Sequence, residues 1–590
     1  MDKLCGFGCH RHWPKLLSML SSPIKLPTVQ KLITGLFFLL FCAAFSVAQP
    51  SPTYEEAIAA YTELAKRHPK STRLVEVGTT DSGLSLHLFI IDSRGYFEAE
   101  RSHAQGDIIC MVINGIHAGE PCGIEASMQF AEERAAEPEE GIVYVILPVY
   151  NIGGALQRNG LTRVNQNGPD AYGFRGNAQN LDLNRDFTKA DAANTLSLQR
   201  AFHEWKPQVF VDTHTSNGAD YPLAISLIHT MPEGLPRMQG MLLQREIVPN
   251  IYQAMAERGE EMNPYVYTKG ATPEQGIYAF TDIARYSTGY AALWGALGFI
   301  TEAHMLKPYE KRVEATRRFL ESLEEVMLKH RSTIHSLYAS AENSRRSQRE
   351  FTTQWEHSDE VDSINFIGYR VDSLLSKVTG LPRLYYNSTQ PYRDKVPYYG
   401  THLSVRKFKL PKAFALPQGW SHLIEKLEAS GVQYRRLGQD SLVNAEAYFV
   451  EDYKTVDKPY EGHYLHFETR TVLRPVSVQL REGDYIIPCN QSANAFLAQV
   501  FDPEGPDSYF NWNFFDQVLM QKEYFSAYLF EETAAELIKR NPLLRKSFED
   551  KKSSDPAFAK DANAQLNFIY QNSKYREPNY LRIPVYRLGL

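Results

Sequence analysis

His117 and Glu120 stand three residues apart in segment 113–121, whose sequence is INGIHAGEP. The glycines and the proline of this segment predict a turn rather than a helix. A turn excludes the helical His-Glu-x-x-His arrangement of metal sites, and the proline excludes its inverted form. An imidazole and a carboxylate at this spacing can both reach one metal ion. Because the tetrapeptide alone is common in surface turns, the rest of the chain has to supply further ligands.

Two more candidate residues accompany β-favouring runs: His214 follows one predicted strand, and Glu302 ends another. Open α/β sheets place their sites at the carboxyl ends of strands. Zinc in a hydrolase typically has three protein ligands and one open position for water. His117, Glu120 and His214 are therefore a candidate ligand set. A general base must be a carboxylate close to that water, and Glu302 is the candidate.

Strands and helices alternate along the first part of the chain. Amphipathic or charged segments predict helices at 53–68, 123–135, 191–204 and 308–338, and apolar runs predict strands at 72–77, 84–91, 107–113, 141–148, 208–212 and 298–306. This alternation predicts an α/β layer structure. Segment 151–181 lacks periodicity and is predicted to be a long functional loop.

Length and composition predict several domains without a nucleic-acid partner. At 590 residues the chain is too long for one core. A net charge of −6 with no basic stripe gives no sign of nucleic-acid binding. The predicted domains are a signal peptide at 1–48, a catalytic domain at 49–340, a linker at 341–356 and an α+β accessory domain of unknown role at 357–590.

The N-terminal segment reads as a secretory signal. Lysines at 25 and 31 precede the apolar run 32–45, and Ser46 and Ala48 offer a small-residue cleavage site. Cleavage after Ala48 predicts a periplasmic or extracellular protein without a stable membrane span. An uncleaved membrane anchor is the alternative, because the run is just long enough to cross a bilayer.

Three cysteines remain after the predicted cleavage: Cys110, Cys122 and Cys489. An odd number in so long a chain is no disulfide framework. Buried free thiols are expected, although a pair between Cys110 and Cys122 stays open.

The chain from about 53 to 340 resembles the zinc metallocarboxypeptidases of the carboxypeptidase A type. The resemblance rests on four motifs that agree in order, spacing and strand context: GIHAGE at 115–120, DLNR at 182–185, DTH at 212–214 and TE at 301–302. No motif extends it to the C-terminal domain, but the arrangement resembles an exported bacterial subgroup that carries such an extension. The resemblance implies a mixed, mostly parallel twisted sheet flanked by helices.

The resemblance also implies roles around one zinc ion. His117, Glu120 and His214 would hold it. Glu302 would take a proton from water and later pass it to the leaving amine. Asp182 would orient His117 through the free ring nitrogen, as carboxylates behind metal ligands do.

Substrate-binding roles follow in the same way. Asn184 and Arg185 would bind the terminal carboxylate of the substrate, which a guanidinium recognises with two parallel hydrogen bonds. Arg163 would steady the developing oxyanion, with Arg158 as a rival in the same loop.

The selectivity residues are matched more loosely. Tyr278 would be the mobile tyrosine that folds over the substrate, with Tyr286 and Tyr290 as competitors. Arg285 would favour an acidic C-terminal side chain. Asp212 is an extra acid that would either support a metal ligand or bind a substrate amine, and His304 is interpreted as a packing residue.

These residues predict an exported zinc-dependent metallocarboxypeptidase that hydrolyses the C-terminal peptide bond of peptides with a free C-terminal carboxylate. A cell-wall peptide carboxypeptidase or amidase, or an amino-acid deacylase on the same fold, is the alternative. An inactive binding module is a third interpretation, disfavoured because all three ligand positions and the base position are filled.

Overall fold

An eight-stranded sheet forms the centre of the computed structural model, which describes residues 50–589. The predicted signal peptide lies outside the described residues. The strand order is β1-β2-β4-β3-β5-β10-β6-β7. The strands are β1 (Thr72–Thr79), β2 (Ser85–Asp92), β3 (Ile108–Asn114), β4 (Ile142–Leu147), β5 (Val209–Ser216), β6 (Ile225–His229), β7 (Asn263–Pro264) and β10 (Leu297–His304).

The sheet is mixed, with most of its neighbouring strands parallel. The pairs β3–β4, β3–β5, β5–β10 and β6–β7 are parallel, and β1–β2, β2–β4 and β6–β10 are antiparallel. Every residue of β3, β4 and β5 is buried. This explains their continuous apolar character, which is typical of strands covered on both faces. The predicted fold class is confirmed.

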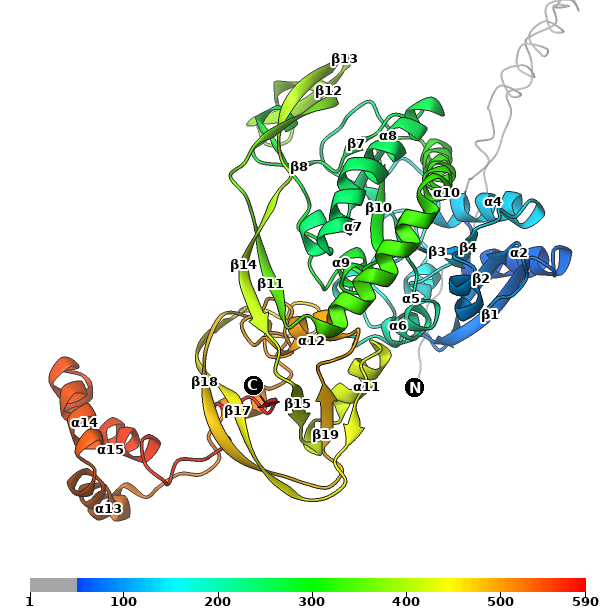
Figure 1. The fold of residues 1–590 in the computed structure, drawn as a ribbon. Helices are drawn as coiled ribbons and strands as arrows, with labels where there is room; N and C mark the ends of the chain where they lie inside the picture. Colours follow the sequence, from blue (N-terminus) through cyan, green and yellow to red (C-terminus); the bar gives the residue numbers. More distant parts are fainter. Residues whose placement is uncertain (1–49, 590) are drawn as a thin grey trace, which may run out of the picture. The chain divides into compact units, whose positions relative to one another are not determined.

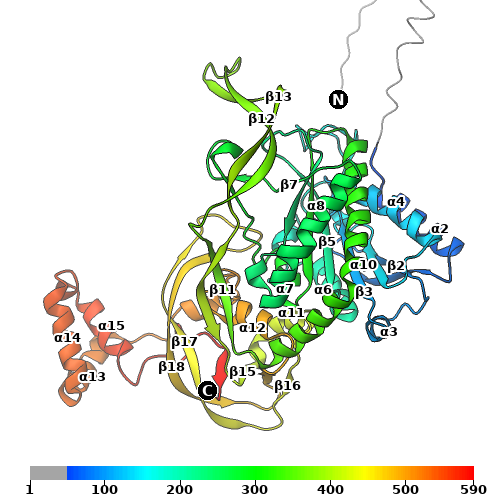
Figure 2. The same ribbon diagram turned by 45° about the horizontal axis from the view of Figure 1, so that its top comes forward.

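Helices cover both faces of the sheet (Figure 1; Figure 2). One face packs against α2 (Tyr54–Arg67), α4 (Cys122–Ala136), α8 (Val248–Glu257) and α10 (Tyr309–Ser347). The other packs against α6 (Ala193–Trp205) and α9 (Ser287–Leu293). Side chains of each central strand alternate between these two cores, as the period of two requires. Thr53 caps α2 by accepting from the Glu56 N–H at 3.1 Å.

Residues 341–356 are not a linker. Helix α10 continues to Ser347, and β11 (Glu350–His357) begins three residues later. Ala341 and Arg345, one helical turn apart, are buried, while Asn343 and Ser344 face solvent. The polar composition that suggested a linker is therefore the outer face of an amphipathic helix.

The C-terminal residues add mostly strands and then helices. Two ribbons pair β12 (Asp362–Leu375) with β13 (Pro382–Tyr399) and β11 with β14 (His402–Lys409). A six-stranded sheet follows, with β15 (Ala413–Leu416), β16 (Arg435–Arg436), β17 (Ser441–Thr455), β18 (His466–Leu480), β19 (Tyr485–Pro488) and β20 (Tyr586–Leu588). The helices are α11 (His422–Ala429), α12 (Asn494–Phe501), α13 (Ala527–Arg540), α14 (Pro542–Ser554) and α15 (Ala562–Gln571).

One hydrophobic core joins several of these elements, β15 and α12 among them, to the first part of the chain. Phe210 of β5 and Phe202 of α6 belong to the same buried cluster as Phe414 of β15 and Phe496 of α12. The described residues, 50–589, accordingly fall into one compact unit. A catalytic domain at 49–340 and an accessory domain at 357–590 stay a prediction.

Cys110, Cys122 and Cys489 are free and buried, as expected. None of the helices between residues 50 and 589 combines the length and hydropathy that a bilayer crossing needs.

Candidate metal centre and active site

Three neighbouring parallel strands bring the candidate residues together. The turn after β3 carries His117 and Glu120, and it starts at Gly115, whose φ of 65° favours glycine. β5 lies beside β3 and carries His214. β10 lies on the other side of β5, with Glu302 in register with His214. Residues separated by long stretches of sequence therefore meet at one edge of the sheet.

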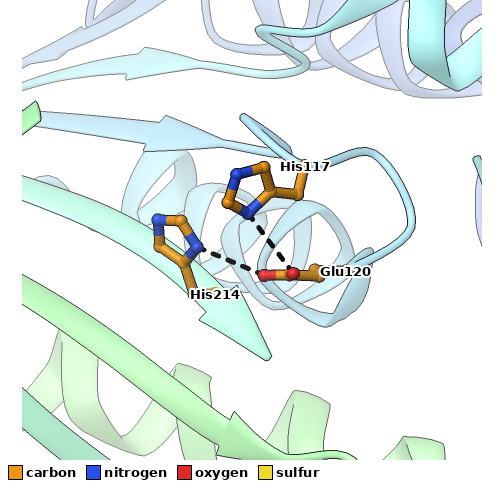
Figure 3. A group of neighbouring side chains, drawn as sticks. All are labelled: His117, Glu120 and His214. Atoms are coloured by element: carbon orange, nitrogen blue, oxygen red, sulfur yellow. Dashed lines mark hydrogen bonds and ion pairs between the residues drawn. The ribbon is translucent and has the colours of Figure 1, made fainter. Parts of the chain in front are cut away.

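His117, Glu120 and His214 form one compact group of potential metal ligands (Figure 3). One donor atom of each lies within 4.8 Å of the others. The Nδ1 atom of His117 is 3.3 Å from Glu120 Oε1, and that of His214 is 3.2 Å from Glu120 Oε2. All three residues are buried. Two imidazoles and one carboxylate are a donor set that zinc takes in hydrolases, so the residues present fit the ion that the sequence predicts.

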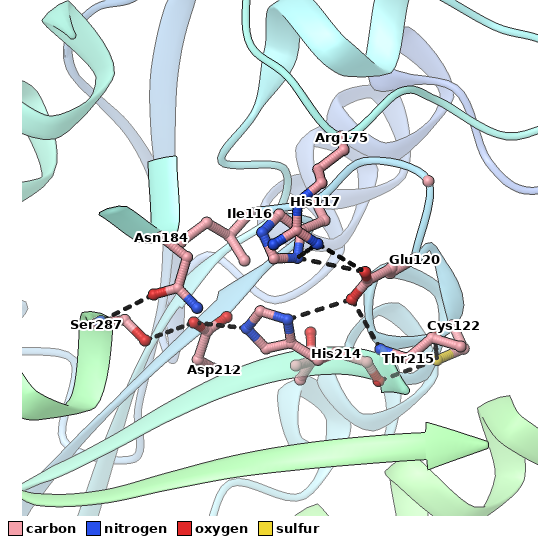
Figure 4. A network of polar contacts seen from close by, with 12 residues as sticks. Ile116, His117, Glu120, Cys122, Arg175, Asn184, Asp212, His214, Thr215 and Ser287 are labelled. Carbon is pink, nitrogen blue, oxygen red and sulfur yellow. Dashed lines mark hydrogen bonds and ion pairs between the residues drawn. The ribbon is translucent and has the colours of Figure 1, made fainter. Parts of the chain in front are cut away.

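An aspartate lies behind each histidine. Asp182 Oδ1 is 3.0 Å from Nε2 of His117. Asp212 Oδ2 is 2.9 Å from Nε2 of His214 (Figure 4). Each aspartate fixes the ring so that Nδ1 faces Glu120. Asp212 also accepts from the Ser287 hydroxyl at 2.6 Å. Of its two predicted roles, this geometry favours support of a metal ligand over binding of a substrate amine.

The charges of the group are tuned by burial and by close partners. Burial alone would raise the pKa of Glu120, but Arg163 and His117 hold it well below its usual value. Burial raises the pKa of Glu302 to about 7, with the nearby Glu120 carboxylate adding to the effect. The pKa of Glu302 is thus shifted in the opposite direction to that of Glu120.

An open cavity of about 170 Å³ lies over this group. Its polar lining includes Arg163, Arg175, Asn184, Arg185 and Glu302, and its apolar lining includes Ile228, Tyr265, Phe280, Tyr286 and Ile300. The cavity is therefore lined both by charged side chains and by neutral, largely aromatic ones.

Asn184 and Arg185 both lie where a substrate carboxylate can reach them. Arg185 Nη1 donates to the carbonyl oxygen of Asn184 at 2.8 Å, and its guanidinium lies 4.7 Å from the centre of the Tyr286 ring. Among the described residues, Nη2 of Arg185 makes no hydrogen bond. The amide oxygen of Asn184 accepts from the Ser287 N–H at 3.0 Å, which leaves its NH₂ group for a ligand.

Two arginines, not one, lie beside the metal group. Arg163 donates to Glu120 Oε1 at 2.8 Å and to the carbonyl oxygen of Thr215 at 2.9 Å. The sequence interpretation missed Arg175, which donates to Asp182 Oδ2 at 2.7 Å and whose Nη1 is 3.3 Å from His117 Nδ1. With 46% of its side chain exposed, Arg175 is the more accessible of the two.

Arg158, the alternative to Arg163, has a structural role instead. Arg158 donates to the main-chain oxygens of Ser51 and Ala171 at 2.6 and 3.0 Å. It ties the start of the described chain to the long loop, and it does not line the cavity.

The structure corrects the position predicted for Tyr278. Tyr278 lies in the two-residue strand β9 (Ile277–Tyr278) and packs against Tyr399 and His357, with ring centres 5.0 and 4.6 Å away. It does not line the cavity, whereas its competitor Tyr286 does. Tyr290, the second competitor, is buried in the core. β9 pairs with β13, a strand much later in the chain, and this pairing keeps Tyr278 outside the cavity.

Arg285 is likewise not a selectivity residue of this cavity. Its Nε donates to Asp507 Oδ1 at 2.6 Å, and Nη2 donates to the carbonyl oxygen of Pro506 at 2.9 Å. The side chain is buried and does not line the cavity. The carboxylate of Asp507 is thus paired with the guanidinium that was predicted to select an acidic side chain of the substrate. His304 is buried, and its Nε2 lies 2.7 Å from the carbonyl oxygen of Ala219.

Several known carboxypeptidases are similar to this chain. The sequence model of the zinc carboxypeptidase family matches residues 58–220. Carboxypeptidase 2 of Trichophyton equinum is 21% identical over 445 residues, which cover 72% of this chain and 76% of that protein. Carboxypeptidase 2 of Trichophyton rubrum is 22% identical over 416 residues, or 67% and 72% of the two chains. A metallo-carboxypeptidase structure from Burkholderia cenocepacia is 16% identical with a TM-score of 0.35, covering 47% of this chain and 70% of that one.

Over residues 58–220 the chain therefore matches the zinc carboxypeptidase family, a class whose donor set the metal group also fits. It is a zinc metallopeptidase, a hydrolase. The matched residues include His117, Glu120 and His214 but end before β10, which carries Glu302.

Proposed function

We propose that this protein is a zinc-dependent carboxypeptidase that removes one residue from the C-terminus of peptides with a free carboxylate. The observation that carries the proposal is that the buried His117–Glu120–His214 group opens into the same cavity as Asn184 and Arg185. Such a cavity can hold the terminal carboxylate at one point and the scissile bond at another. A zinc ion held by the three residues would polarise the scissile carbonyl and lower the pKa of water.

The protein's own side chains would position the peptide and move the protons. Arg185 Nη2 and the Asn184 amide would hold the terminal carboxylate. Glu302 would accept a proton from the attacking water and donate it to the nitrogen of the departing amino acid. Arg175, the more accessible arginine beside the metal group, would stabilise negative charge on the carbonyl oxygen.

We expect the Arg185→Ala substitution to reduce kcat/KM on peptides with a free C-terminal carboxylate by roughly 10- to 150-fold. This range corresponds to about 1.5–3 kcal/mol for a hydrogen bond to a charged group. The measurement is the kcat/KM of matched free and C-terminally amidated peptides. Arg200→Ala, which removes a half-exposed arginine paired with Glu425 at 3.1 Å, is the control. Equal losses on free and amidated peptides would contradict carboxylate recognition by Arg185.

The alternative activities use the same metal group with other substrates. Cell-wall peptides with a free carboxylate, and N-acyl amino acids, can be assayed beside ordinary peptides. The pairing of Asn184 and Arg185 supports a substrate with a free carboxylate. Higher kcat/KM on a cell-wall peptide than on any ordinary peptide would move the proposal to that substrate class.

We expect the enzyme to prefer an apolar or aromatic C-terminal residue. Ile228, Tyr265, Phe280 and Ile300 are neutral residues of the cavity lining, and Arg285 is held by Asp507. An acidic side chain packed against these neutral residues would lose its hydration without gaining a cation from Arg285. In a digested peptide library, mass spectrometry should show C-terminal Phe or Leu removed at least about tenfold faster than Asp or Glu. Faster release of acidic residues would mean that another cation reaches the side chain.

Export is part of the proposal and rests on the sequence alone. The lysines at 25 and 31, the apolar run 32–45 and the Ser46-x-Ala48 exit support a signal peptide. We therefore place the enzyme in the periplasm or outside the cell.

A further inference from the structure

We infer that the turn between β17 and β18 positions the carboxylate-binding arginine, and that Tyr460 and Glu461 of this turn act as positioning residues for Arg185 and Asp182. The inference deepens the proposed function and depends on it. The turn lies about 275 residues after Arg185 and contacts it directly. The inference therefore gives the C-terminal residues a role in substrate recognition.

The segment that carries Asp182, Asn184 and Arg185 has little regular structure of its own. Its only element is a three-residue 3-10 helix, Leu183–Arg185. A 3-10 turn of this length has poorer hydrogen-bond geometry than an α-helix. Contacts from other parts of the chain therefore help to position these residues.

Two hydrogen bonds from the turn reach this segment. The Tyr460 hydroxyl accepts from Nε of Arg185 at 3.1 Å, and Glu461 Oε2 accepts from the Asp182 N–H at 2.7 Å. With Nε and Nη1 engaged, the guanidinium plane is set while Nη2 stays free. The Glu461 contact holds the main chain at the aspartate that orients His117. Neither Tyr460 nor Glu461 lines the cavity, so both act through other residues.

One residue of the turn is held in a conformation that non-glycine residues seldom adopt. Glu461 has a φ of 50°, in the left-handed region, and is followed by Gly462, whose φ of 82° is one that glycine adopts freely. Reciprocal main-chain hydrogen bonds between Tyr460 and His463, at 2.7 and 3.0 Å, close the turn. His463 Nε2 also lies 2.6 Å from Asp191 Oδ2, so the turn is attached again at the far end of the 182–191 segment.

Trp512 supports the turn from behind. This side chain is fully buried, and its ring lies nearly parallel to that of Tyr460, with centres 6.0 Å apart and an angle of 14° between the planes. The guanidinium of Arg285 lies 4.9 Å from the centre of the Trp512 ring. Arg285 and its partner Asp507 thus help to fix the residues that hold Arg185.

The experiment compares Tyr460→Phe with Tyr464→Phe, since Tyr464 lies in the same turn, is exposed and has no hydrogen bond among the described residues. Tyr460→Phe should reduce kcat/KM on free-carboxylate peptides by roughly 2- to 12-fold, the effect of one hydrogen bond. The loss should fall mainly on KM, with little change on amidated peptides. Glu461→Ala, with exposed Glu451→Ala as control, should reduce kcat/KM on the same free-carboxylate peptides.

A double-mutant cycle separates positioning from a general structural effect. In an Arg185→Ala background, Tyr460→Phe should have no further effect on kcat/KM. An undiminished effect in that background, or no effect of Tyr460→Phe alone, would overturn the inference. Failure of the wild type to distinguish free from amidated peptides would instead overturn the proposed function. Thermal unfolding and zinc content, measured for every variant, should match the wild type for Tyr460→Phe.

Discussion

Replacement of Glu302 by glutamine is expected to lower kcat by about 10²–10⁴-fold while the zinc content stays unchanged. Glutamine has nearly the same shape as glutamate but cannot accept a proton from water. Glu302 is not among the three grouped metal ligands, so metal binding should survive its loss. The expected result is therefore a folded, metal-loaded protein with almost no turnover.

The position and the pKa of Glu302 support this expectation. Glu302 is in register with His214 on the neighbouring parallel strand, and it lines the cavity. Burial raises its pKa to about 7, and a bound cation would lower the pKa by favouring the charged form. Glu302 is then ionised at neutral pH and ready to accept a proton. Activity should fall as the pH drops through its pKa, because the protonated acid is no base.

The matched control is Glu233→Gln. Burial also raises the pKa of Glu233, but this residue lies outside the cavity over the metal group. The control should keep wild-type kcat. Zinc is quantified by elemental analysis and kcat by peptide hydrolysis. A Glu302→Gln enzyme that retains more than about a tenth of wild-type kcat would show that another group accepts the proton.

The core of the fold and the metal group were predictable because their signals are local. The apolar runs of β3, β4 and β5 reflect burial on both faces of the sheet, and such runs are visible in the sequence without knowledge of the fold. Glycines and a proline around His117 predict the turn at the end of β3. His214 and Glu302 then follow from strand ends, because parallel strands bring their carboxyl ends to one edge of the sheet.

The outer part of the site was not predictable in the same way, because it depends on contacts across hundreds of residues. Tyr278 lies outside the cavity because its strand pairs with β13, and Arg285 is paired with Asp507. Nothing in the sequence near Tyr278 or Arg285 indicates these distant partners. Arg175 resembles any other arginine of the long loop until its distance to Asp182 is known. Tyr460 lies in a region without catalytic motifs, so only the folded chain brings it to Arg185.

The second large effect concerns the aspartate behind His214. Asp212→Asn is expected to weaken zinc binding by about 10- to 100-fold, the usual cost of losing a carboxylate behind a metal-binding histidine. Asp212 Oδ2 lies 2.9 Å from His214 Nε2 and favours the tautomer whose Nδ1 faces Glu120. Asparagine can present its NH₂ group to the same nitrogen, which would favour the wrong tautomer.

The effect should also depend on pH, with a sign that follows from the pKa of His214. Burial alone would lower this pKa, but Asp212 and Glu120 raise it well above its ordinary value. Zinc must therefore displace a proton from His214, and its apparent affinity should fall by about tenfold for each pH unit below that pKa. In Asp212→Asn the neutral asparagine no longer raises the pKa of His214, so burial makes this pKa lower than in the wild type. The pH dependence of zinc affinity should then be shallower than in the wild type.

The two curves of zinc affinity against pH are thus expected to converge as the pH falls. Competition with a chromogenic chelator from about pH 6 to about pH 8 measures them. Asp220→Asn is the control, because Asp220 lies 3.9 Å from His304, a histidine outside the metal group. Parallel curves for wild type and Asp212→Asn would mean that Asp212 does not set the protonation of His214. Unchanged affinity at the upper pH would mean that it does not orient the ring either, and its burial beside Ser287 would then be purely structural.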